Sequence, residues 1–499
     1  MDNSMSLTEK NAQNNKSNEF SIPEIKVSPY KGIATMFHIL CSKYQSLVEG
    51  DSDDDGFREK SLYEIAHTYM VIGTLYDDTE DYEDSMICYN QGLEVCESLP
   101  DNTMYTNLKM DIHSCIAHCY TQQRKYQEAI KYLVDIISTT DEDNPEELIA
   151  ISALYIELGR AYKNAGQYID ALNINIKTFN LIKDILSPND SKIATAYNNI
   201  AASYLDLGDF QNGLKFLLKA LQTLNTQIDS ATCVTITTLC NIGATYRNLY
   251  KYDDSLKYLK KAHELCVDKL SYDGLRTANI LSEISNTYCC QNKYDDALQN
   301  ETKVLKFREK ILKEGSIEFI PSFSILSNIY SEFGDYEKAL NYLKKQLRIH
   351  QDKLPVDDPT NISLYTNLSC TYSDLGDYDN AEEYLKKAIS LGEKIYPLNH
   401  YELASLYSNA SDLYKIMGNL KIALNYAKKA LNIQENSCFK DAKSIGITYC
   451  NLGEIYECLG DKEKSLEYYN KSLISFSLCL SENDSHIEVV NKKIQNLFK

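Results

Sequence analysis

The chain has 499 residues, 39 of them tyrosine and none tryptophan, and its formal net charge is −20. Binding to nucleic acid or to an anionic membrane surface relies on a basic face, so the charge disfavours both. No apolar run approaches the roughly 20 residues that span a bilayer, and the polar first twenty residues lack a secretory core segment. We expect a cytoplasmic protein without membrane insertion, whose 15 cysteines are reduced thiols.

The N-terminal part of the chain divides into two short segments. Residues 1–26 are rich in Asn, Ser and Lys, a composition typical of a disordered tail. Residues 27–59 are expected to hold a capping helix, over the stretch 30–48 (YKGIATMFHILCSKYQSLV), followed by the acidic loop DSDDDG. Such a helix would cover the end of the structure that follows it.

Residues 60–478 are repetitive. Each copy is marked by an anchor residue that mostly follows Gly-Asp or a related pair; the first interval between anchors is 44 residues and the other eight are 42. The anchors are Tyr82, Tyr126, Tyr168, Phe210, Tyr252, Tyr294, Tyr336, Tyr378, Leu420 and Lys462. Eight equal intervals predict ten copies of one supersecondary unit.

Three positions around the anchor keep their residue type in all ten copies. A tyrosine stands six residues before the anchor, and a small residue stands nine before it and three after it, as in Tyr204, Ala201 and Gly213. Small residues let two helices approach closely, and the tyrosine ring fills the seam between them. A glycine before the anchor ends the first helix. Each copy is therefore an antiparallel helical hairpin, and the hairpins stack so that each contacts only its neighbours.

The chain closes with residues 479–499. The stretch 484–498 (DSHIEVVNKKIQNLF) predicts a polar helix. An open stack of repeats requires such a cap, because its last repeat would otherwise expose an apolar face.

The repeat resembles the tetratricopeptide repeat (TPR) superfamily, position by position in Ile200–Ala201, Tyr204, Gly208-Asp209-Phe210 and Gly213. A standard TPR has 34 residues; the 42-residue unit is similar to the repeats of kinesin light chains, as are the linkers at 187–194, 355–363 and 396–404. The resemblance implies an all-α, right-handed superhelical solenoid of about ten antiparallel helical hairpins (TPR-like) that binds other proteins.

Asparagine recurs eleven residues before the anchor in five copies, as Asn199, Asn241, Asn367, Asn409 and Asn451, while two intervening copies hold Glu283 and Ile325. Asparagine is a poor helix former, but its carboxamide both donates and accepts, so a row of them can pair with the main chain of an extended peptide. In TPR proteins this position lines the concave face, and the resemblance to the asparagine ladders of kinesin light chains and O-GlcNAc transferase implies peptide binding. The alternative is an asparagine that bridges adjacent hairpins.

Two other patterns have a structural alternative. Cys115, His118 and Cys119 fall on one helix face and suggest a metal site, but a fourth ligand is not evident, so ordinary packing is the better interpretation. Eight copies carry a lysine nine residues after the anchor: Lys177, Lys219, Lys261, Lys303, Lys345, Lys387, Lys429 and Lys471. A solvated helix face explains this ladder better than a strip for acidic partners.

These patterns favour a non-enzymatic scaffold or adaptor that binds extended peptide segments of other proteins in a concave groove. The alternative is a regulatory TPR protein gated by a ligand or peptide. A clamp for a chaperone's C-terminal carboxylate needs Lys or Arg twelve residues before the anchor, and no copy has one there. The catalytic motifs HExxH, GxSxG, GxGxxG and the P-loop do not occur, so we expect no enzyme, no cofactor and no metal.

Overall fold

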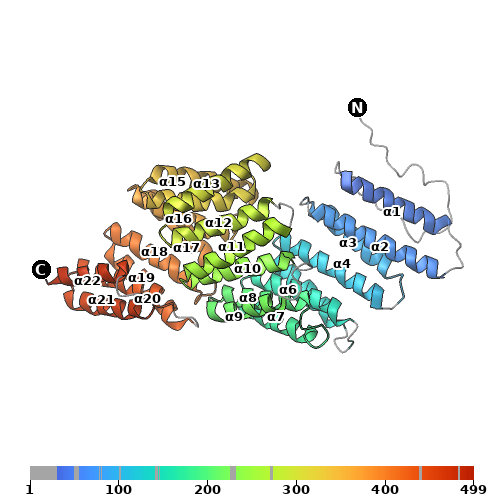
Figure 1. Ribbon diagram of the computed structural model, residues 1–499, viewed down its shortest axis with the longest axis horizontal. Coiled ribbons are helices and arrows are strands. Elements are labelled where there is room, and N and C mark those ends of the chain that lie inside the picture. The colour runs from blue at the N-terminus through green and yellow to red at the C-terminus, as the bar shows by residue number, and fades with distance from the viewer. Residues whose placement is uncertain are drawn as a thin grey trace. The chain divides into compact units, whose positions relative to one another are not determined.

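The structure is a computed structural model that describes residues 31–49, 55–77, 79, 81–100, 103–140, 144, 147–224, 232–269, 274–437, 441–480 and 484–498. Within these ranges it consists of 22 α-helices and a short 3₁₀ helix, with no strand (Figure 1). The all-α solenoid that the sequence predicts is confirmed. The tail predicted over 1–26 lies outside the described residues.

The helices form two compact units, Met1–Leu186 and Ser187–Lys499. Unit 1 contains α1 (Lys31–Glu49), α2 (Asp55–Asp77), α3 (Tyr82–Cys96), α4 (Thr103–Gln122), α5 (Tyr126–Ser138), α6 (Leu148–Asn164) and α7 (Tyr168–Ile182). Unit 2 contains α8 (Ser191–Asp206), α9 (Phe210–Leu224), α10 (Thr232–Asn248), α11 (Tyr252–Lys269), α12 (Gly274–Cys290), α13 (Tyr294–Ile311), η2 (Ile317–Phe319), α14 (Ile320–Glu332), α15 (Tyr336–Lys353), α16 (Thr360–Asp374), α17 (Tyr378–Ile395), α18 (Tyr401–Ile416), α19 (Leu420–Asn436), α20 (Ala442–Cys458), α21 (Lys462–Ser477) and α22 (Ser485–Leu497).

Each anchor is the first residue of the second helix of a hairpin, in all ten copies. The hairpins therefore pair α2 with α3, α4 with α5, and so on to α20 with α21; we number them 1 to 10. The helix α1 packs on α2 at one end, and α22 packs on α21 at the other.

A left-handed residue two positions before the anchor ends the first helix. Glycine takes this position in six hairpins, with φ between 75° and 80°: Gly166, Gly208, Gly334, Gly376, Gly418 and Gly460. The following N–H returns to the helix, as where Asp209 N donates to Tyr204 O at 2.8 Å, which is the Schellman pattern. Arg124, Tyr250 and Asn292 take the same position at φ of 58–60°, a conformation that a bulky side chain such as tyrosine rarely adopts.

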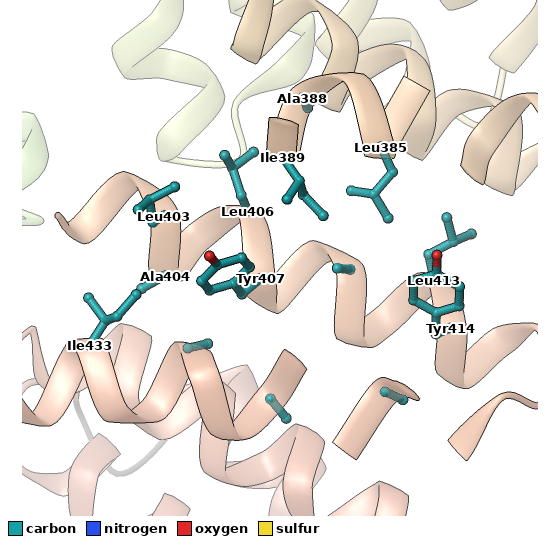
Figure 2. Packing of buried hydrophobic residues seen from close by; sticks show 14 of the residues in the cluster. Leu385, Ala388, Ile389, Leu403, Ala404, Leu406, Tyr407, Leu413, Tyr414 and Ile433 are labelled. Atoms are coloured by element: carbon teal, nitrogen blue, oxygen red, sulfur yellow. The ribbon is translucent and has the colours of Figure 1, made fainter. Parts of the chain in front are cut away.

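The small residues hold the two helices of a hairpin together. A Cβ added at Gly453 would lie 2.5 Å from the ring of Tyr469, which is fully buried. Ser465 Oγ donates to Gly453 O across the same seam at 2.8 Å. Figure 2 shows the two seams of α18: Leu385 and Ile389 of α17, in the preceding hairpin, lie on one side of it, and Ile433 of α19, in its own hairpin, lies on the other.

In six hairpins the tyrosine six residues before the anchor stacks on an aromatic residue six after it. Tyr414 and Tyr426 have ring centroids 5.8 Å apart and an interplanar angle of 2°; Tyr204 and Phe216 are 5.6 Å apart at 12°. The predicted contact across the seam is confirmed, although Tyr204 itself is only half-buried.

The lysine ladder covers these ring pairs. Lys429 Nζ lies 5.1 Å from the ring centroid of Tyr407 and 5.5 Å from that of Tyr426. The same type of contact occurs at Lys177, Lys219, Lys261, Lys345, Lys387 and Lys471. At exposed sites such contacts contribute about 0.5–1 kcal/mol. The ladder thus has a structural role that the solvated-face interpretation did not include.

Substituting Tyr204→Ala should lower local stability in hairpin 4 by about 2 kcal/mol, roughly half the cost of truncating a fully buried aromatic ring. Hydrogen exchange should become faster in α8 and α9, whereas Tyr204→Phe, which keeps the stacked ring, should leave protection unchanged. Unchanged protection in the alanine variant would mean that the ring does not stabilise the seam.

Unit 2 contains contacts between hairpins that are not neighbours. His400 Nε2 lies 3.0 Å from the carbonyl oxygen of Asp206, and because a carbonyl only accepts, Nε2 carries the proton. The ring of Tyr401 packs edge-on against Phe210, with centroids 6.2 Å apart at 73°. The turn of hairpin 4 thus contacts the beginning of hairpin 9.

A second contact of this kind joins hairpins 5 and 10. Tyr250 OH donates to Asp441 Oδ2 at 2.9 Å, and Lys443 Nζ lies 4.9 Å from the Tyr250 ring centroid. The expectation that each hairpin contacts only its neighbours is therefore wrong within unit 2. Its superhelix returns on itself after five hairpins, and the strained backbone of Tyr250 lies at this contact.

Candidate binding groove

The first helices of the hairpins form the inner layer of unit 2. Each contacts the first helix of the next hairpin, from α8 with α10 through α12 with α14 to α18 with α20. Successive second helices make no comparable contact within the ranges that the structure describes. Elements on the inner side of a curved stack lie closer together, so the first helices line the concave face.

A hollow of about 510 Å³ opens on this inner layer between α10, α12 and the η2–α14 segment, in hairpins 5 to 7. We call it the central hollow. Its lining is Ile236, Thr237, Cys240, Arg276, Asn279, Ile280, Ser282, Glu283, Asn286, Glu318, Pro321, Ser324, Ile325 and Asn328. The volume lies within the range typical of ligand sites, roughly 300–1,000 Å³.

The position eleven residues before the anchor faces this concave surface. Glu283 and Ile325, which hold it in hairpins 6 and 7, line the hollow. The predicted site residues occupy the same register in the flanking hairpins: Asn199 on α8, Asn241 on α10, Asn367 on α16 and Asn409 on α18, each half-buried. By repeat equivalence these four carboxamides belong to the inner layer.

Asn451, the fifth predicted site residue, has a different environment. Its side chain is 8% exposed, and Nδ2 donates to Asp412 Oδ2 of the preceding hairpin at 3.2 Å. Lys415 donates to Asp412 Oδ1 at 3.0 Å and also pairs with Glu454. Asn451 thus makes the contact between adjacent hairpins that the alternative interpretation describes.

Sequence reasoning missed two asparagines of the inner layer. Asn286 and Asn328 stand eight residues before their anchors and line the central hollow. They occur in hairpins 6 and 7, where Glu283 and Ile325 stand eleven residues before the anchor in place of asparagine. In these two hairpins the row of carboxamides therefore continues one helical turn further along the helix. The signal was present in the sequence, as the three-residue offset that separates neighbours on a helix face. We call Asn199, Asn241, Asn286, Asn328, Asn367 and Asn409 the asparagine row.

The electrostatics of the inner layer change along unit 2. At the hollow, Arg247 Nη1 pairs with Glu283 Oε2 at 2.6 Å. Further along, burial raises the pKa of Asp412. Burial, and then the nearby Glu332 carboxylate, raises the pKa of Asp374. The layer is therefore charge-balanced at the hollow, and further along its buried carboxyl groups are shifted toward their neutral form.

The cysteines of the possible metal site in unit 1 are buried thiols. Burial raises the pKa of Cys115 to about 12 and also raises that of Cys119. His118 Nδ1 lies 3.7 Å from Glu157 Oε2, and its Nε2 lies 2.9 Å from Gln122 Nε2. Metals bind the thiolate form, and among the described residues no three His, Cys, Asp or Glu side chains converge as a metal site.

No helix in the described ranges combines the length and the apolar character that crossing a bilayer requires. The lining of the central hollow, as the structure describes it, contains one basic side chain, Arg276, whereas neutralising phosphates takes several. The hollow therefore presents mainly amide and hydroxyl groups with balanced charges.

Family models of the tetratricopeptide repeat match this chain over residues 66–98, 114–147, 193–225, 234–310, 322–394 and 402–473. Together the matches cover more than half of its length and include hairpins of both units. No curated protein matches the chain in sequence.

Solved structures with a similar fold include a Rap protein complexed with competence and sporulation factor, with 12% identity and a TM-score of 0.52 over 74% of this chain and 98% of that one. BtubC (BKLC) from P. vanneervenii has 18% identity and a TM-score of 0.37 over 46% and 91% of the two chains. A Podosopora anserina putative kinesin light chain has 15% and 0.36 over 42% and 98%. With its repeat matches and its ten helical hairpins, the chain belongs to the tetratricopeptide repeat superfamily.

Proposed function

We propose that this protein is a non-enzymatic, cytoplasmic interaction scaffold or adaptor, and that unit 2 binds extended peptide segments of other proteins along its concave face. The observation that carries the proposal is the asparagine row, which follows the inner layer from hairpin 4 to hairpin 9 beside the central hollow. A carboxamide offers a donor and an acceptor together, as does each residue of a peptide main chain.

The spacing of the row suits an extended chain. Packed helices lie about 8–10 Å apart, and an extended peptide advances about 3.3 Å per residue. One asparagine per hairpin therefore meets about every third residue of the ligand. Binding through the main chain fixes the direction and register of the peptide and leaves selection among peptides to other parts of the groove.

The peptide-gated alternative is favoured by the contact between hairpins 4 and 9. A superhelix that returns on itself has two arrangements, with this contact made or broken, and a ligand in the groove shifts the balance if it binds one of them more tightly. A Rap protein, with a similar fold at a TM-score of 0.52, was solved in complex with competence and sporulation factor. In the gated mechanism the peptide binds in the same groove, and its binding also changes whether hairpins 4 and 9 are in contact.

The test begins with a displayed library of random twelve-residue peptides selected on the wild-type chain. Replacing Asn241, Asn367 and Asn409 together by alanine should weaken binding of the selected peptides about tenfold to a few hundredfold, because each neutral hydrogen bond contributes a net ~0.5–1.5 kcal/mol and 1.4 kcal/mol is a factor of ten. The affinities are measured by titration calorimetry. Salt should change them little, since the contacts are uncharged.

Asn451→Ala is the matched control. It removes the same side chain at the same register, but from a carboxamide that bonds Asp412 within the protein. We expect it to lower stability and to leave peptide affinity unchanged. Equal affinities for the wild type and a folded triple variant would refute the asparagine row as the binding surface.

A further inference from the structure

Hairpin 6 contains an ion pair with no exposure to solvent. Glu301 and Arg308, both on α13, have side chains that are 0% exposed, with Nη1 of the arginine 3.6 Å from Oε1 of the glutamate. Neither Glu301 Oε2 nor Arg308 Nε has a hydrogen-bond partner among the described residues. Removing two charges from water is costly, and the attraction between them often fails to recover that cost.

The packing of the hairpin does not require this pair. The two positions are seven and fourteen residues after the anchor, where hairpin 4 holds Leu217 and Leu224 and hairpin 5 holds Leu259 and Cys266. All four of those side chains are buried. An apolar pair is therefore compatible with the same helical architecture, and the charges in hairpin 6 call for another explanation.

The ion pair reaches the lining of the central hollow. Arg308 Nη2 donates to Asn279 Oδ1 at 2.6 Å, and Nη1 donates to Ser282 Oγ at 3.1 Å. Ser282 Oγ in turn donates to Glu301 Oε1 at 3.0 Å. Asn279 is exposed and lines the hollow with Ser282. Because the arginine occupies the acceptor end of the Asn279 carboxamide, the N–H₂ end serves as the donor toward a ligand.

The remaining lining defines the chemistry of the ligand. Ile236, Ile280 and Ile325 belong to the lining but are only 1%, 2% and 7% exposed. The lining residues that are open to solvent are mostly polar, as at Thr237, Asn279 and Asn328. The charged groups balance, because Glu283 is paired with Arg247 and the lining otherwise contains one arginine and one glutamate, Arg276 and Glu318. A volume of about 510 Å³ accommodates a short stretch of peptide and not only one side chain.

We propose that the central hollow is the specificity subsite of the groove, and that it takes a neutral stretch of the bound peptide with small polar side chains. The buried pair Glu301–Arg308 acts as a positioning device, because it holds Asn279 so that its N–H₂ group meets a main-chain carbonyl of that stretch. A donor held in place before binding loses little entropy when the ligand arrives. The proposal rests on the proposed peptide-binding function and specifies its ligand.

The same twelve-residue library tests the proposal. Peptides selected on the wild type should be enriched in adjacent Ser, Thr, Asn or Gln, and replacing these residues by aspartate should abolish binding. Asn279→Ala should weaken the selected peptides about threefold to tenfold, the value of one hydrogen bond. Ser363→Ala removes a small polar side chain at the equivalent position of hairpin 8 and should have no effect.

A second variant separates positioning from folding. Glu301→Leu with Arg308→Leu installs the leucine pair of hairpin 4, so it should stay folded, while the affinity for the selected peptides falls to the level of Asn279→Ala. If peptides are selected without enrichment in small polar residues, or if Asn279→Ala leaves their affinity unchanged, the subsite is refuted while the groove stands. If the wild type selects no peptide at all, the proposed function itself fails.

Discussion

Replacing Arg308 alone by leucine should lower the free energy of unfolding of unit 2 by about 3–5 kcal/mol. The reason is that the substitution leaves the Glu301 carboxylate buried without its counter-ion, and an unpaired buried charge costs several kcal/mol. Burial lowers the pKa of the guanidinium even in the intact pair, the direction expected where an interior disfavours charge. Urea unfolding monitored by circular dichroism gives the free energy directly.

The double variant Glu301→Leu, Arg308→Leu should recover the whole of this loss. Replacing both members of a buried pair by well-packed apolar residues is neutral, or stabilising by about 1–4 kcal/mol, and Leu217 and Leu224 show that a leucine pair fits these positions in hairpin 4. Stability that rises while peptide affinity falls distinguishes a pair kept for binding from one kept for folding. A single variant as stable as the wild type would contradict the burial of the pair.

The fold followed from the sequence because its determinants are local. The fold depends on the 42-residue period, on the small residues of the seam and on the glycines at φ near 75–80°. Each of these acts within one hairpin, so the structure predicted for one copy applies to all ten. For the same reason the anchors fall on the first residue of every second helix. The aromatic partner six residues after the anchor was missed, because in hairpins 1, 3 and 6 that position holds Cys88, Ile174 and Asn300 and the pattern is incomplete.

The candidate site was only partly predictable. The resemblance to TPR proteins implied which register faces the concave side, and Asn199, Asn241, Asn367 and Asn409 lie in that register on the first helices. Whether a given carboxamide meets solvent or a neighbour depends on the facing hairpin, as Asn451 and Asp412 show. The ion pair Glu301–Arg308 appears in the sequence as two ordinary helix residues, and only the packing of α12, α13 and α14 shows that both are buried.

The contact between hairpins 4 and 9 could not be predicted from the sequence, because it depends on the small rotation between each hairpin and the next, which accumulates over five hairpins. Loss of this contact should also lower stability in a part of the chain that is far in sequence from the substituted residues. His400 is 8% exposed and lies between two rings, stacked on Tyr396 at 4.5 Å and tilted against Tyr401 at 4.7 Å. The ring of Tyr401 in turn lies over the turn at Gly208.

Replacing His400 and Tyr401 together by alanine should lower the stability of unit 2 by about 2–4 kcal/mol. This is somewhat less than two fully buried aromatic truncations would cost, because Tyr401 is 37% exposed. Hydrogen exchange should become faster in hairpin 9, where the changes are made, and also in the turn after α8, which lies 194 residues away from His400 at Asp206. Faster exchange confined to hairpin 9 would show that the two hairpins do not support each other.

Mild acidification should weaken the same contact in the unchanged protein. Burial lowers the pKa of His400, and its bond to Asp206 only partly opposes this, so below an ordinary histidine pKa of about 6.5 the unfolded chain binds a proton that the folded chain excludes. The unfolded state then holds more protons, and stability falls as the pH drops. The contribution of His400 is therefore complete above about pH 7 and is lost progressively below it.

The neighbouring carboxyl group responds in the opposite sense. Burial raises the pKa of Glu402 above its ordinary value, so the folded state binds that proton more readily than the unfolded state and gains stability as the pH falls. The single variant His400→Ala separates the two effects, because it keeps Glu402 and removes the imidazole. The difference in unfolding free energy between wild type and variant should shrink between pH 7.5 and pH 5. A difference that stays constant over this range would show that the imidazole does not change its protonation when the contact opens.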